Sequence, residues 1–361
     1  MAAKPVLIMA GGTGGHVFPA LAVAEYLRDQ GIELFWLGTN SGLESRIIPE
    51  KHIRFLTIKI SGLRGKGLGR LLMFPIILSI AFIQAFKLLT KYRPCVVLGM
   101  GGYVSGPGGI AAWLLRIPLL IHEQNSVAGL TNRILSPLAR TVMLGFPGTL
   151  QGKKVLTTGN PVRQDILDLS LPEQRFINRG DQPLRLLVLG GSLGARAFNE
   201  IMPSVIKQLP ERMNIDVLHQ TGKQNYNSTK LLYEEHHLDT DKVLPFIDDM
   251  AHAYDWADVV LCRSGALTVS ELSVVGIASI LVPYPYAVDD HQIFNAKYLS
   301  DYDCAILIKQ SELTELGLIK VLSEFHDRRN RLLEMANMTR NRSFRDATMD
   351  VGNACMRFVN A

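Results

Sequence analysis

The sequence predicts an α/β protein made of two similar halves, each built on a parallel β-sheet. Short apolar runs such as residues 6–9 and 33–37 alternate with segments of helical spacing, which is typical of strands that crossover helices bury on both faces. Glycine-rich turns follow several of these runs. A length of 361 residues fits two domains, and a content of 47% hydrophobic and 20% charged residues excludes a disordered or disulfide-stapled chain.

The first half begins with a strand at residues 6–9, a glycine turn at residues 11–16 (GGTGGH) and a helix at residues 17–28. Another glycine-rich segment, residues 99–109, follows a strand at residues 95–98. Glycines before a helix let the backbone approach a ligand and point free N–H groups at it, which suits a phosphate or pyrophosphate. The dinucleotide fingerprint and the Walker pattern are absent, so we expect neither NAD binding nor P-loop chemistry.

The second half repeats this order, with a strand at residues 184–189, a glycine turn at residues 190–195 (GGSLGA) and a helix at residues 198–209. The segment TGNPVR, residues 158–163, is a turn-forming sequence and a plausible hinge between the halves.

The predicted domains are an N-terminal acceptor and membrane-docking domain, a C-terminal donor domain and a final helix that returns towards the first domain. Their boundaries are residues 1–162, 163–340 and 341–361.

The net charge limits the classes of partner that we expect, and the cysteines indicate the cellular compartment. The net charge of +5 favours anionic partners, yet no helix-turn-helix, RNA-binding aromatic motif or long basic run is present, so we expect no nucleic acid. Four cysteines stand far apart in the sequence, which indicates a reducing, cytoplasmic compartment. Asp289, Asp290 and His291 are adjacent and cannot all face one ion from a regular element, so no metal site is predicted.

Two side chains beside the turns could carry chemistry. His16 ends the first glycine turn, where a neutral imidazole could take a proton from a hydroxyl; the alternative is a histidine that caps or packs the helix. Glu271 falls in the first turns of a helix that follows the strand at residues 258–261, where a carboxylate could accept both hydroxyls of a ribose; the alternative is a solvated glutamate.

One apolar segment, residues 71–86, departs from the α/β pattern. Only Pro75, Ser79 and Gln84 in it fall outside the hydrophobic class. The segment is either a helix buried between the sheet and the rest of the domain, or a helix whose apolar surface rests in a membrane interface with basic residues on anionic headgroups. A transmembrane helix is the least favoured alternative, because strand patterns stand on both sides of it. The flanking basic residues are Lys66, Arg70, Lys87, Lys91 and Arg93.

An ordered set of motifs resembles one bacterial enzyme family, the UDP-N-acetylglucosamine:undecaprenyl-pyrophosphoryl-N-acetylmuramoyl-pentapeptide N-acetylglucosaminyltransferases. Each glycine turn is a weak signal, but the ordered set is specific and runs from residue 6 to about residue 300. The motifs are GGTGGHVFPA (residues 11–20), GGYVSGP (101–107), HEQN (122–125), GNPVR (159–163), GGSLGA (190–195), HQTGK (219–223), FIDDM (246–250) and CRSGALTVSE (262–271).

The resemblance implies a GT-B fold, in which two Rossmann-like domains face each other across a cleft. It implies an inverting transfer of N-acetylglucosamine from UDP-N-acetylglucosamine to the 4-hydroxyl of lipid I, giving lipid II for peptidoglycan synthesis. No metal or other cofactor is expected. The partners would be the two substrates and the anionic cytoplasmic face of the membrane, to which the protein would be peripherally bound.

The resemblance also implies roles for individual residues. His16 is our first candidate for the catalytic base and Glu123 the second. The predicted donor-binding residues are Thr13, Gly14, Gly15, Asn125, Arg163, Ser192, Ile247, Ala266, Leu267, Thr268, Glu271 and Gln292. The residues predicted to receive the acceptor pyrophosphate are Gly14, Gly15, Gly101, Gly102, Tyr103 and Ser105, and those predicted to dock on the membrane are Ile76, Phe82, Phe86, Lys87 and Lys91. The loop at residues 285–292 varies in length and sequence within the family, and of its last two residues the resemblance assigns Gln292 rather than His291 to the donor.

Two rival functions remain compatible with the sequence. A UDP-sugar epimerase of the same architecture would use buried carboxylates and no lipid, which would leave the apolar segment unexplained. A non-catalytic nucleotide-sugar sensor would close on its ligand without turnover. Release of UDP in the presence of a lipid pyrophosphate acceptor distinguishes the three.

Overall fold

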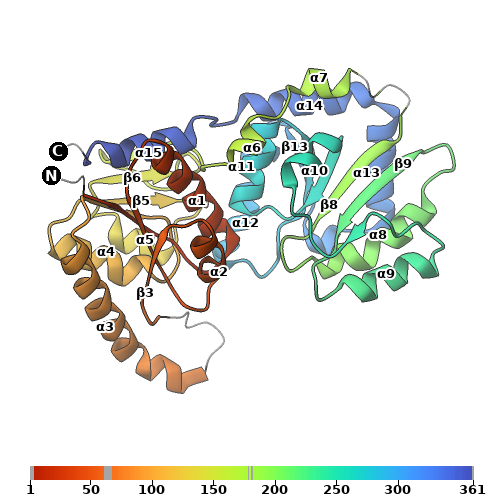
Figure 1. Ribbon diagram of the computed structural model, residues 1–361. Coiled ribbons are helices and arrows are strands. Elements are labelled where there is room, and N and C mark those ends of the chain that lie inside the picture. Colours follow the sequence, from red (N-terminus) through yellow and green to blue (C-terminus); the bar gives the residue numbers. More distant parts are fainter. Residues whose placement is uncertain (1–3, 61–66, 178, 180–181, 360–361) are drawn as a thin grey trace. The chain divides into compact units, whose positions relative to one another are not determined.

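The computed structural model describes residues 4–60, 67–177, 179 and 182–359 (Figure 1). The chain divides into two compact units. The first consists of Met1–Arg163 together with Phe344–Ala361, and the second of Gln164–Ser343. The two predicted parallel α/β halves are confirmed.

The first unit is built on a parallel sheet with the strand order β3-β2-β1-β4-β5-β6-β7 within the described residues. Strand β1 lies inside the sheet and pairs on both sides, with Val6 opposite Leu34 of β2 and Val96 of β4. Every residue of β1 is buried, as the apolar run predicts. The strands are β1 (Val6–Met9), β2 (Leu34–Gly38), β3 (Arg54–Thr57), β4 (Val96–Gly99), β5 (Leu119–Glu123), β6 (Thr141–Leu144) and β7 (Val155–Thr157).

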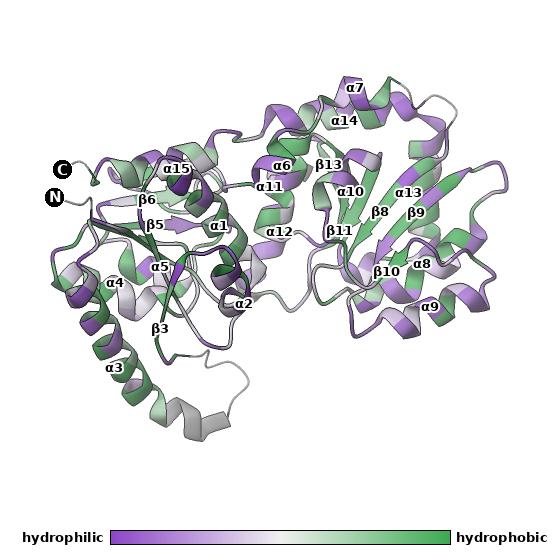
Figure 2. Ribbon diagram, in the orientation of Figure 1, coloured by the Kyte–Doolittle hydropathy of each residue, from purple (hydrophilic) through white to green (hydrophobic). Residues whose placement is uncertain are grey.

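Helices cover both faces of this sheet. Alternate residues of β1 point to opposite faces: Val6 and Ile8 pack in one apolar cluster with α1, and Leu7 and Met9 pack in another with α3 and α4. Figure 2 shows the strands as predominantly hydrophobic. The helices of this unit are α1 (Gly14–Asp29), α2 (Glu44–Glu50), α3 (Gly67–Tyr92), α4 (Ser105–Leu114), α5 (Leu130–Leu135) and the C-terminal α15 (Ala347–Met356).

Helix α15 is part of the first unit although it follows the whole of the second in sequence. Its residues Val351 and Cys355 belong to the apolar cluster beneath α1. The hydroxyl of Tyr26 in α1 donates to the side-chain oxygen of Asn353 at 3.0 Å, and the hydroxyl of Thr348 donates to the carbonyl of Val162 at 3.0 Å. The tail therefore closes one face of the first unit.

The second unit repeats the same architecture with the strand order β10-β9-β8-β11-β12-β13 within the described residues. Counted from its own first strand, this order matches that of the first unit up to the sixth strand. The strands are β8 (Leu184–Leu189), β9 (Ile215–Gln220), β10 (Val243–Leu244), β11 (Val259–Cys262), β12 (Ala278–Leu281) and β13 (Ala305–Leu307).

The helices of the second unit pack on its sheet through a core that includes Phe198, Met202 and Phe325. The α-helices are α6 (Gln164–Leu167), α7 (Pro172–Phe176), α8 (Arg196–Gln208), α9 (Tyr226–Glu235), α10 (Met250–Trp256), α11 (Ala266–Val275), α12 (His291–Ser300), α13 (Glu315–Asp327) and α14 (Arg329–Asn341). Two short 3₁₀ helices are η1 (Val288–Asp290) and η2 (Gln310–Glu312).

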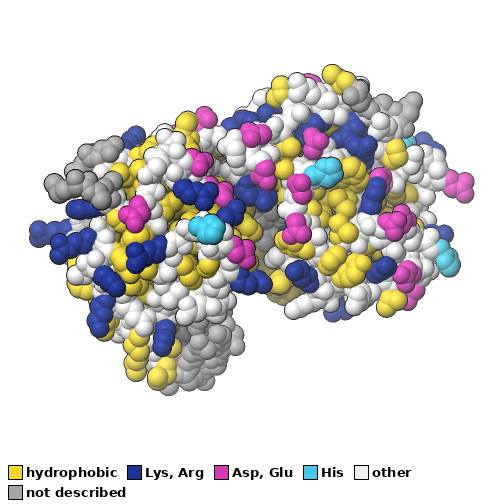
Figure 3. Space-filling model, viewed as in Figure 1, with side chains coloured by type: hydrophobic (Ala, Val, Ile, Leu, Met, Phe, Trp, Pro, Cys, Tyr) yellow, Lys and Arg dark blue, Asp and Glu magenta, His cyan; other side chains and the backbone are white. Residues whose placement is uncertain are grey.

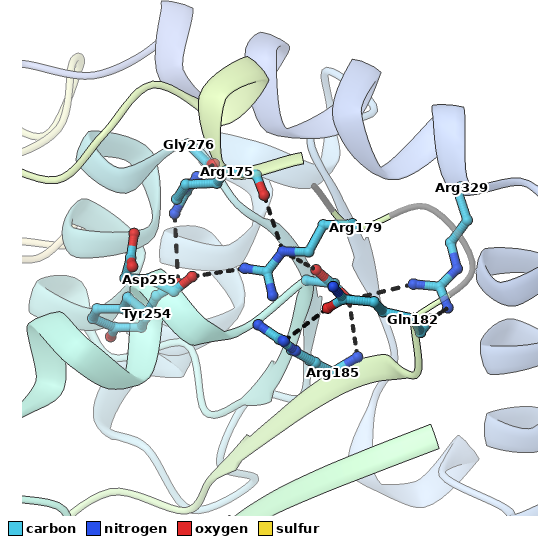
Figure 4. Close-up of polar contacts among 9 residues, drawn as sticks. Arg175, Arg179, Gln182, Arg185, Tyr254, Asp255, Gly276 and Arg329 are labelled. Atoms are coloured by element: carbon cyan, nitrogen blue, oxygen red, sulfur yellow. Dashed lines mark hydrogen bonds and ion pairs between the residues drawn. The ribbon is translucent and has the colours of Figure 1, made fainter. Parts of the chain in front are cut away.

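A buried polar network fixes α7 and α14 at the amino-terminal edge of this sheet (Figure 4). Asp258, which is fully buried, accepts from the backbone N–H of Arg185 at 2.9 Å and pairs with Arg179 and Arg329, each at 3.3 Å. Arg175 is also buried and donates to the backbone carbonyl of Val275. Burial lowers the pKa of Arg175 to about 10, so it remains charged at neutral pH.

In each sheet the strand order changes direction once, between β1 and β4 and between β8 and β11. Ligands of such sheets bind at the carboxyl ends of the strands beside this switch point. The glycine turns at residues 11–16, 99–103 and 190–195 follow β1, β4 and β8, so all three stand at a switch point.

Candidate functional site

The two glycine turns of the first unit are packed against each other at the switch point. Gly102 has a φ of +82°, and a Cβ there would collide with the carbonyl of Gly11. Only glycine therefore suits this position. Because the turns touch through backbone, the N–H groups that open α1 at Gly14 and Gly15 lie close to the turn after β4. Thr13, in extended conformation, is the residue before the helix.

The carboxylate of Glu44, which was not predicted from the sequence, is hydrogen-bonded to the glycine turn after β1. Glu44 of α2 is fully buried. It accepts from the N–H of Gly12 at 3.0 Å, and from the N–H and hydroxyl of Thr39 at 2.9 and 2.8 Å. The turn after β1 and the end of β2 are thereby tied to one side chain. No sequence motif marks this residue, because its partner Gly12 is 32 positions away.

His16 lies half-buried in the first turn of α1. Its Nδ1 is 3.0 Å from Oε1 of Gln124, a buried side chain from the loop after β5. The turn at Gly101 packs directly against the same ring, since a Cβ on Gly101 would lie 2.5 Å from Nδ1. The imidazole is therefore held in place at the switch point.

Glu123, the second candidate base, has a carboxylate that is buried and engaged by its own loop. One oxygen accepts from the N–H of Asn125 at 3.0 Å. The other accepts from the N–H of Gly129 at 2.9 Å and from the amide of Asn132 at 2.9 Å. This geometry favours a role in shaping the loop that carries Asn125 over proton abstraction.

His122, next to Glu123, is a fully buried neutral histidine. Its Nε2 is 2.9 Å from the carbonyl of Gly159. Burial lowers the pKa of His122 to about 4, so the ring is uncharged at neutral pH.

In the turn after β4, Tyr103 is exposed and Ser105 is buried. The Tyr103 side chain is 51% exposed, whereas Ser105 is fully buried and its hydroxyl donates to the carbonyl of Gly101 at 2.9 Å. The Ser105 hydroxyl therefore holds the turn, and a contact of Ser105 with the pyrophosphate stays a prediction.

Arg163 is the last residue of the longer of the two chain segments that form the first unit. Its guanidinium lies 5.8 Å from the centre of the Phe18 ring, which places its charge beside the first turns of α1. The predicted donor residues are therefore divided between the units: Thr13, Gly14, Gly15, Asn125 and Arg163 belong to the first, and the rest belong to the second.

In the second unit Ser192 is exposed in the turn after β8. Gln220, which was not predicted from the sequence, stabilises this turn. The buried amide of Gln220 donates to the carbonyl of Gly191 at 2.9 Å and accepts from the N–H of Ile247 at 2.8 Å. The turn that carries Ser192 and the segment that carries Ile247 are thereby held at one edge of the sheet. The motif HQTGK contains Gln220 but does not reveal this bridge.

Helix α11 begins at this same edge, after β11. Ala266, Leu267 and Thr268 form its first turn, behind Gly265 in extended conformation. Glu271 lies one turn further and is only 7% exposed, so it is not a solvated glutamate. Its Oε2 accepts from the hydroxyl of Tyr254 at 3.0 Å, which fixes the direction of the carboxylate.

Gln292 lies in the first turn of α12, and both its backbone and its side chain anchor the preceding loop. Its Oε1 accepts from the N–H of Tyr284 at 2.9 Å, and its carbonyl accepts from the hydroxyl of Ser264 at 2.8 Å. The loop between β12 and α12 is thus connected to the segment after β11.

Helix α3 carries the apolar segment, and its exposed stripe differs from the prediction. Met73, Ile76, Ile80 and Ile83 are between 45% and 53% exposed. Phe82 and Phe86 instead pack half-buried against the core of the first unit, next to the buried Ala81, Ala85 and Leu89. Among the flanking basic residues, Lys87 and Lys91 are exposed, while Lys66 and the side chain of Arg70 lie outside the described residues.

Residues Met73–Tyr92 of α3 are long and apolar enough to cross a membrane by length and composition alone. Within the described parts of the chain, no three His, Cys, Asp or Glu side chains form a group that could hold a metal ion.

Comparison with protein families matches both units. The glycosyltransferase family 28 N-terminal domain matches residues 6–144, and the family 28 C-terminal domain matches residues 185–351.

Curated relatives are similar over nearly their whole length. A protein of Nitrosospira multiformis is 51% identical over 355 residues, 98% of each chain, and one of Coxiella burnetii is 48% identical over 358 residues, 99% of each chain. Both are named UDP-N-acetylglucosamine–N-acetylmuramyl-(pentapeptide) pyrophosphoryl-undecaprenol N-acetylglucosamine transferase.

Solved structures agree with this similarity. The crystal structure of Acinetobacter baumannii MurG covers 98% of this chain and 99% of its own, with a TM-score of 0.83 and 42% identity. A UDP-GlcNAc 2-epimerase from Neisseria meningitidis covers 98% of this chain and 100% of its own, with a TM-score of 0.68 but only 13% identity, so it shares the fold alone.

Proposed function

This chain belongs to glycosyltransferase family 28 and, within it, to the UDP-N-acetylglucosamine–N-acetylmuramyl-(pentapeptide) pyrophosphoryl-undecaprenol N-acetylglucosamine transferases, and from that membership we propose how its residues perform the reaction. The enzyme has a GT-B fold and transfers N-acetylglucosamine from UDP-N-acetylglucosamine to lipid I, giving lipid II and UDP for peptidoglycan synthesis. The observation that carries this conclusion is the identity of about half of all positions over nearly the whole chain.

The second unit binds the donor in this proposal. The uracil lies against Ile247, the ribose hydroxyls are accepted by the carboxylate of Glu271, and the diphosphate faces Ser192 and the first turn of α11. What supports this is that Gln220 and Tyr254 hold Ile247 and Glu271 at one edge of the sheet. Ala266, Leu267 and Thr268 line the same helix N-terminus, whose dipole favours an anion. Gln292 binds the sugar, and the role of Asn125, in the first unit, as a donor residue stays a prediction.

The first unit binds the acceptor. Its pyrophosphate is received by the N–H groups of Gly14 and Gly15 and by the turn at Gly101, Gly102 and Tyr103. The burial of Ser105 argues for a supporting role there. The close packing of the two turns supports this part of the proposal, because it brings several backbone donors together.

The chemical step is an inverting displacement. The oxygen of the acceptor 4-hydroxyl forms a bond to the anomeric carbon, the bond from that carbon to the β-phosphate oxygen breaks with its electron pair going to UDP, and the hydroxyl proton passes to His16. The backbone position of His16 at the switch point supports its role as the base.

Positive potential from the protein replaces a divalent cation in this proposal. The leaving diphosphate gains negative charge as the bond breaks, and helix N-termini with Arg163 can stabilise that charge. We therefore expect turnover to persist in the presence of a chelator.

The first unit also docks on the anionic cytoplasmic face of the membrane, where the lipid acceptor resides, which makes the protein a peripheral membrane protein. Supporting this are Ile76, Ile80 and Ile83, which form one exposed stripe on α3, with Lys87 and Lys91 exposed further along the helix. Figure 3 shows hydrophobic side chains flanked by Lys and Arg over the part where Figure 1 draws α3.

The function is tested with purified protein, UDP-N-acetylglucosamine and a short-chain lipid I analogue in detergent. We expect UDP release that requires the acceptor and that continues in EDTA. An epimerised sugar nucleotide formed without acceptor would identify an epimerase, and binding without UDP release would identify a sensor; either outcome contradicts the proposal. Loss of activity in EDTA alone, restored by Mg²⁺, contradicts metal independence and leaves the transfer itself intact.

A further inference from the structure

We infer that Gln124 is a positioning residue that fixes the tautomer of His16, so that the proton sits on Nδ1 and Nε2 presents its lone pair to the acceptor hydroxyl. This inference rests on the proposed role of His16 as the base. It extends that role because it names the ring atom that takes the proton and the side chain that selects it.

The orientation of the Gln124 amide follows from its surroundings. Its Nε2 donates to the backbone carbonyl of Met100 at 2.8 Å. A carbonyl oxygen can only accept, so the group that faces Met100 must be the NH₂ end of the amide. Oε1 is consequently the end that faces His16.

The protonation of the imidazole follows in turn. Oε1 of Gln124 can only accept, and it lies 3.0 Å from Nδ1 of His16. A neutral imidazole has one N–H, and the hydrogen bond that one nitrogen makes decides which nitrogen carries it. Nδ1 therefore bears the hydrogen, and Nε2 is left as the acceptor.

Several contacts keep Gln124 itself from moving. The side chain is 1% exposed. Its backbone carbonyl accepts from the side-chain amide of Asn160 at 3.0 Å. Met100, the acceptor for its amide, is fully buried and donates its own N–H to the carbonyl of Met9 at 2.8 Å. The amide is thus fixed to the two central strands of the sheet.

A neutral acceptor suits this task better than a carboxylate would. A carboxylate beside Nδ1 would stabilise the charged imidazolium, which has no lone pair to accept a proton. The carboxylate next in sequence, Glu123, is engaged with Asn125, Gly129 and Asn132 instead. Gln124 selects the tautomer without adding a charge.

The test is ¹⁵N NMR of the histidine side chains in the full-length free protein, with the His16 signals assigned by their loss in His16→Gln. For the neutral ring of the wild type, we expect Nδ1 to be protonated and Nε2 to show the chemical shift of an unprotonated nitrogen. The opposite tautomer, or a mixture in the wild type, would overturn the inference.

Two variants separate positioning from general destabilisation. Gln124→Met keeps the length of the side chain but removes the acceptor, so we expect a mixture of tautomers and a kcat lower by about tenfold with the donor KM within twofold. Gln124→Glu restores an acceptor for Nδ1 but loses the donor to the carbonyl of Met100, so the Nδ1–H tautomer should return while kcat recovers only in part. Gln30→Met, the same substitution at an exposed site in the same unit, should behave as the wild type.

The outcomes also separate this inference from the proposed function. If Gln124→Met leaves the tautomer and kcat unchanged, or if Gln124→Glu does not restore the Nδ1–H tautomer, the inference fails. If the tautomer behaves as expected but His16→Ala keeps full turnover, the inference about Gln124 stands and the assignment of His16 as the base fails.

Discussion

Individual buried polar side chains shape the turns of both units. Glu44 holds the N–H of Gly12, and Gln220 joins the carbonyl of Gly191 to the N–H of Ile247. Each of these side chains is nearly inaccessible, and each bonds backbone groups from a segment distant in sequence. Burying such groups is favourable only when their hydrogen bonds are made, so each residue specifies one conformation of a turn that glycine alone would leave loose.

The assignment of His16 as the catalytic base leads to a prediction about this single residue. His16→Ala should lower kcat by about 10²–10⁴-fold, the usual contribution of a positioned base, and should leave the donor KM within a few-fold. Steady-state kinetics with the short-chain acceptor measure both constants. His252→Ala, at an exposed site on α10, is the matched control. A His16 variant with turnover within a few-fold of the wild type would remove the base role.

The individual site residues were only partly predictable. Glycine turns and strand ends are local features, so the sequence indicates Gly14, Gly101 and Ser192 directly. Glu44, Gln124 and Gln220 were missed because their roles depend on partners 24 to 108 residues away in the chain. The sequence also could not show that the carboxylate of Glu123 is occupied by its own loop.

Among the elements, α3 is a helix whose buried side could not be predicted from the sequence. The segment is apolar on nearly every side, so its sequence does not reveal which side faces the sheet. Packing decides this: Ala81, Ala85 and Leu89 are buried, with Phe82 and Phe86 beside them, and the stripe through Ile76, Ile80 and Ile83 remains exposed.

The exposed stripe of α3 makes the prediction for membrane docking. Replacing Ile76, Ile80 and Ile83 together with serine should weaken binding to phosphatidylglycerol vesicles by roughly a hundredfold, because each half-exposed isoleucine contributes about 1 kcal/mol when it enters the interface. Co-sedimentation measures this binding. Turnover of the short-chain acceptor and the melting temperature should change little.

Two outcomes bear on this prediction. Unchanged vesicle binding in the triple variant would exclude docking through this stripe. Phe82→Ser is the contrasting variant: because Phe82 packs on the core, this change should lower the melting temperature rather than act on vesicle binding alone.

For the whole molecule, each unit carries one fully buried neutral histidine, His122 in the first and His219 in the second. Burial lowers their pKa values to about 4 and about 3. The unfolded chain takes up these protons near pH 6.5 and the folded chain does not, so stability should be complete above that pH and should fall as the pH drops towards 4.

The expected loss is about 3 kcal/mol for His122 between pH 6.5 and pH 4. Urea unfolding at a series of pH values measures it, and His122→Asn should flatten that part of the curve for the first unit, as His219→Gln should for the second. A wild-type stability that is constant from pH 6.5 to pH 4 would contradict the prediction.

The return of α15 to the first unit sets the order in which the newly made chain can mature on the ribosome. Residues 1–163 emerge first, but Val351 and Cys355 must still be added to their apolar cluster. The second unit is continuous in sequence and can finish folding as soon as Ser343 has left the exit tunnel. The half that is synthesised earliest is therefore completed last, and until then part of its apolar cluster stays uncovered.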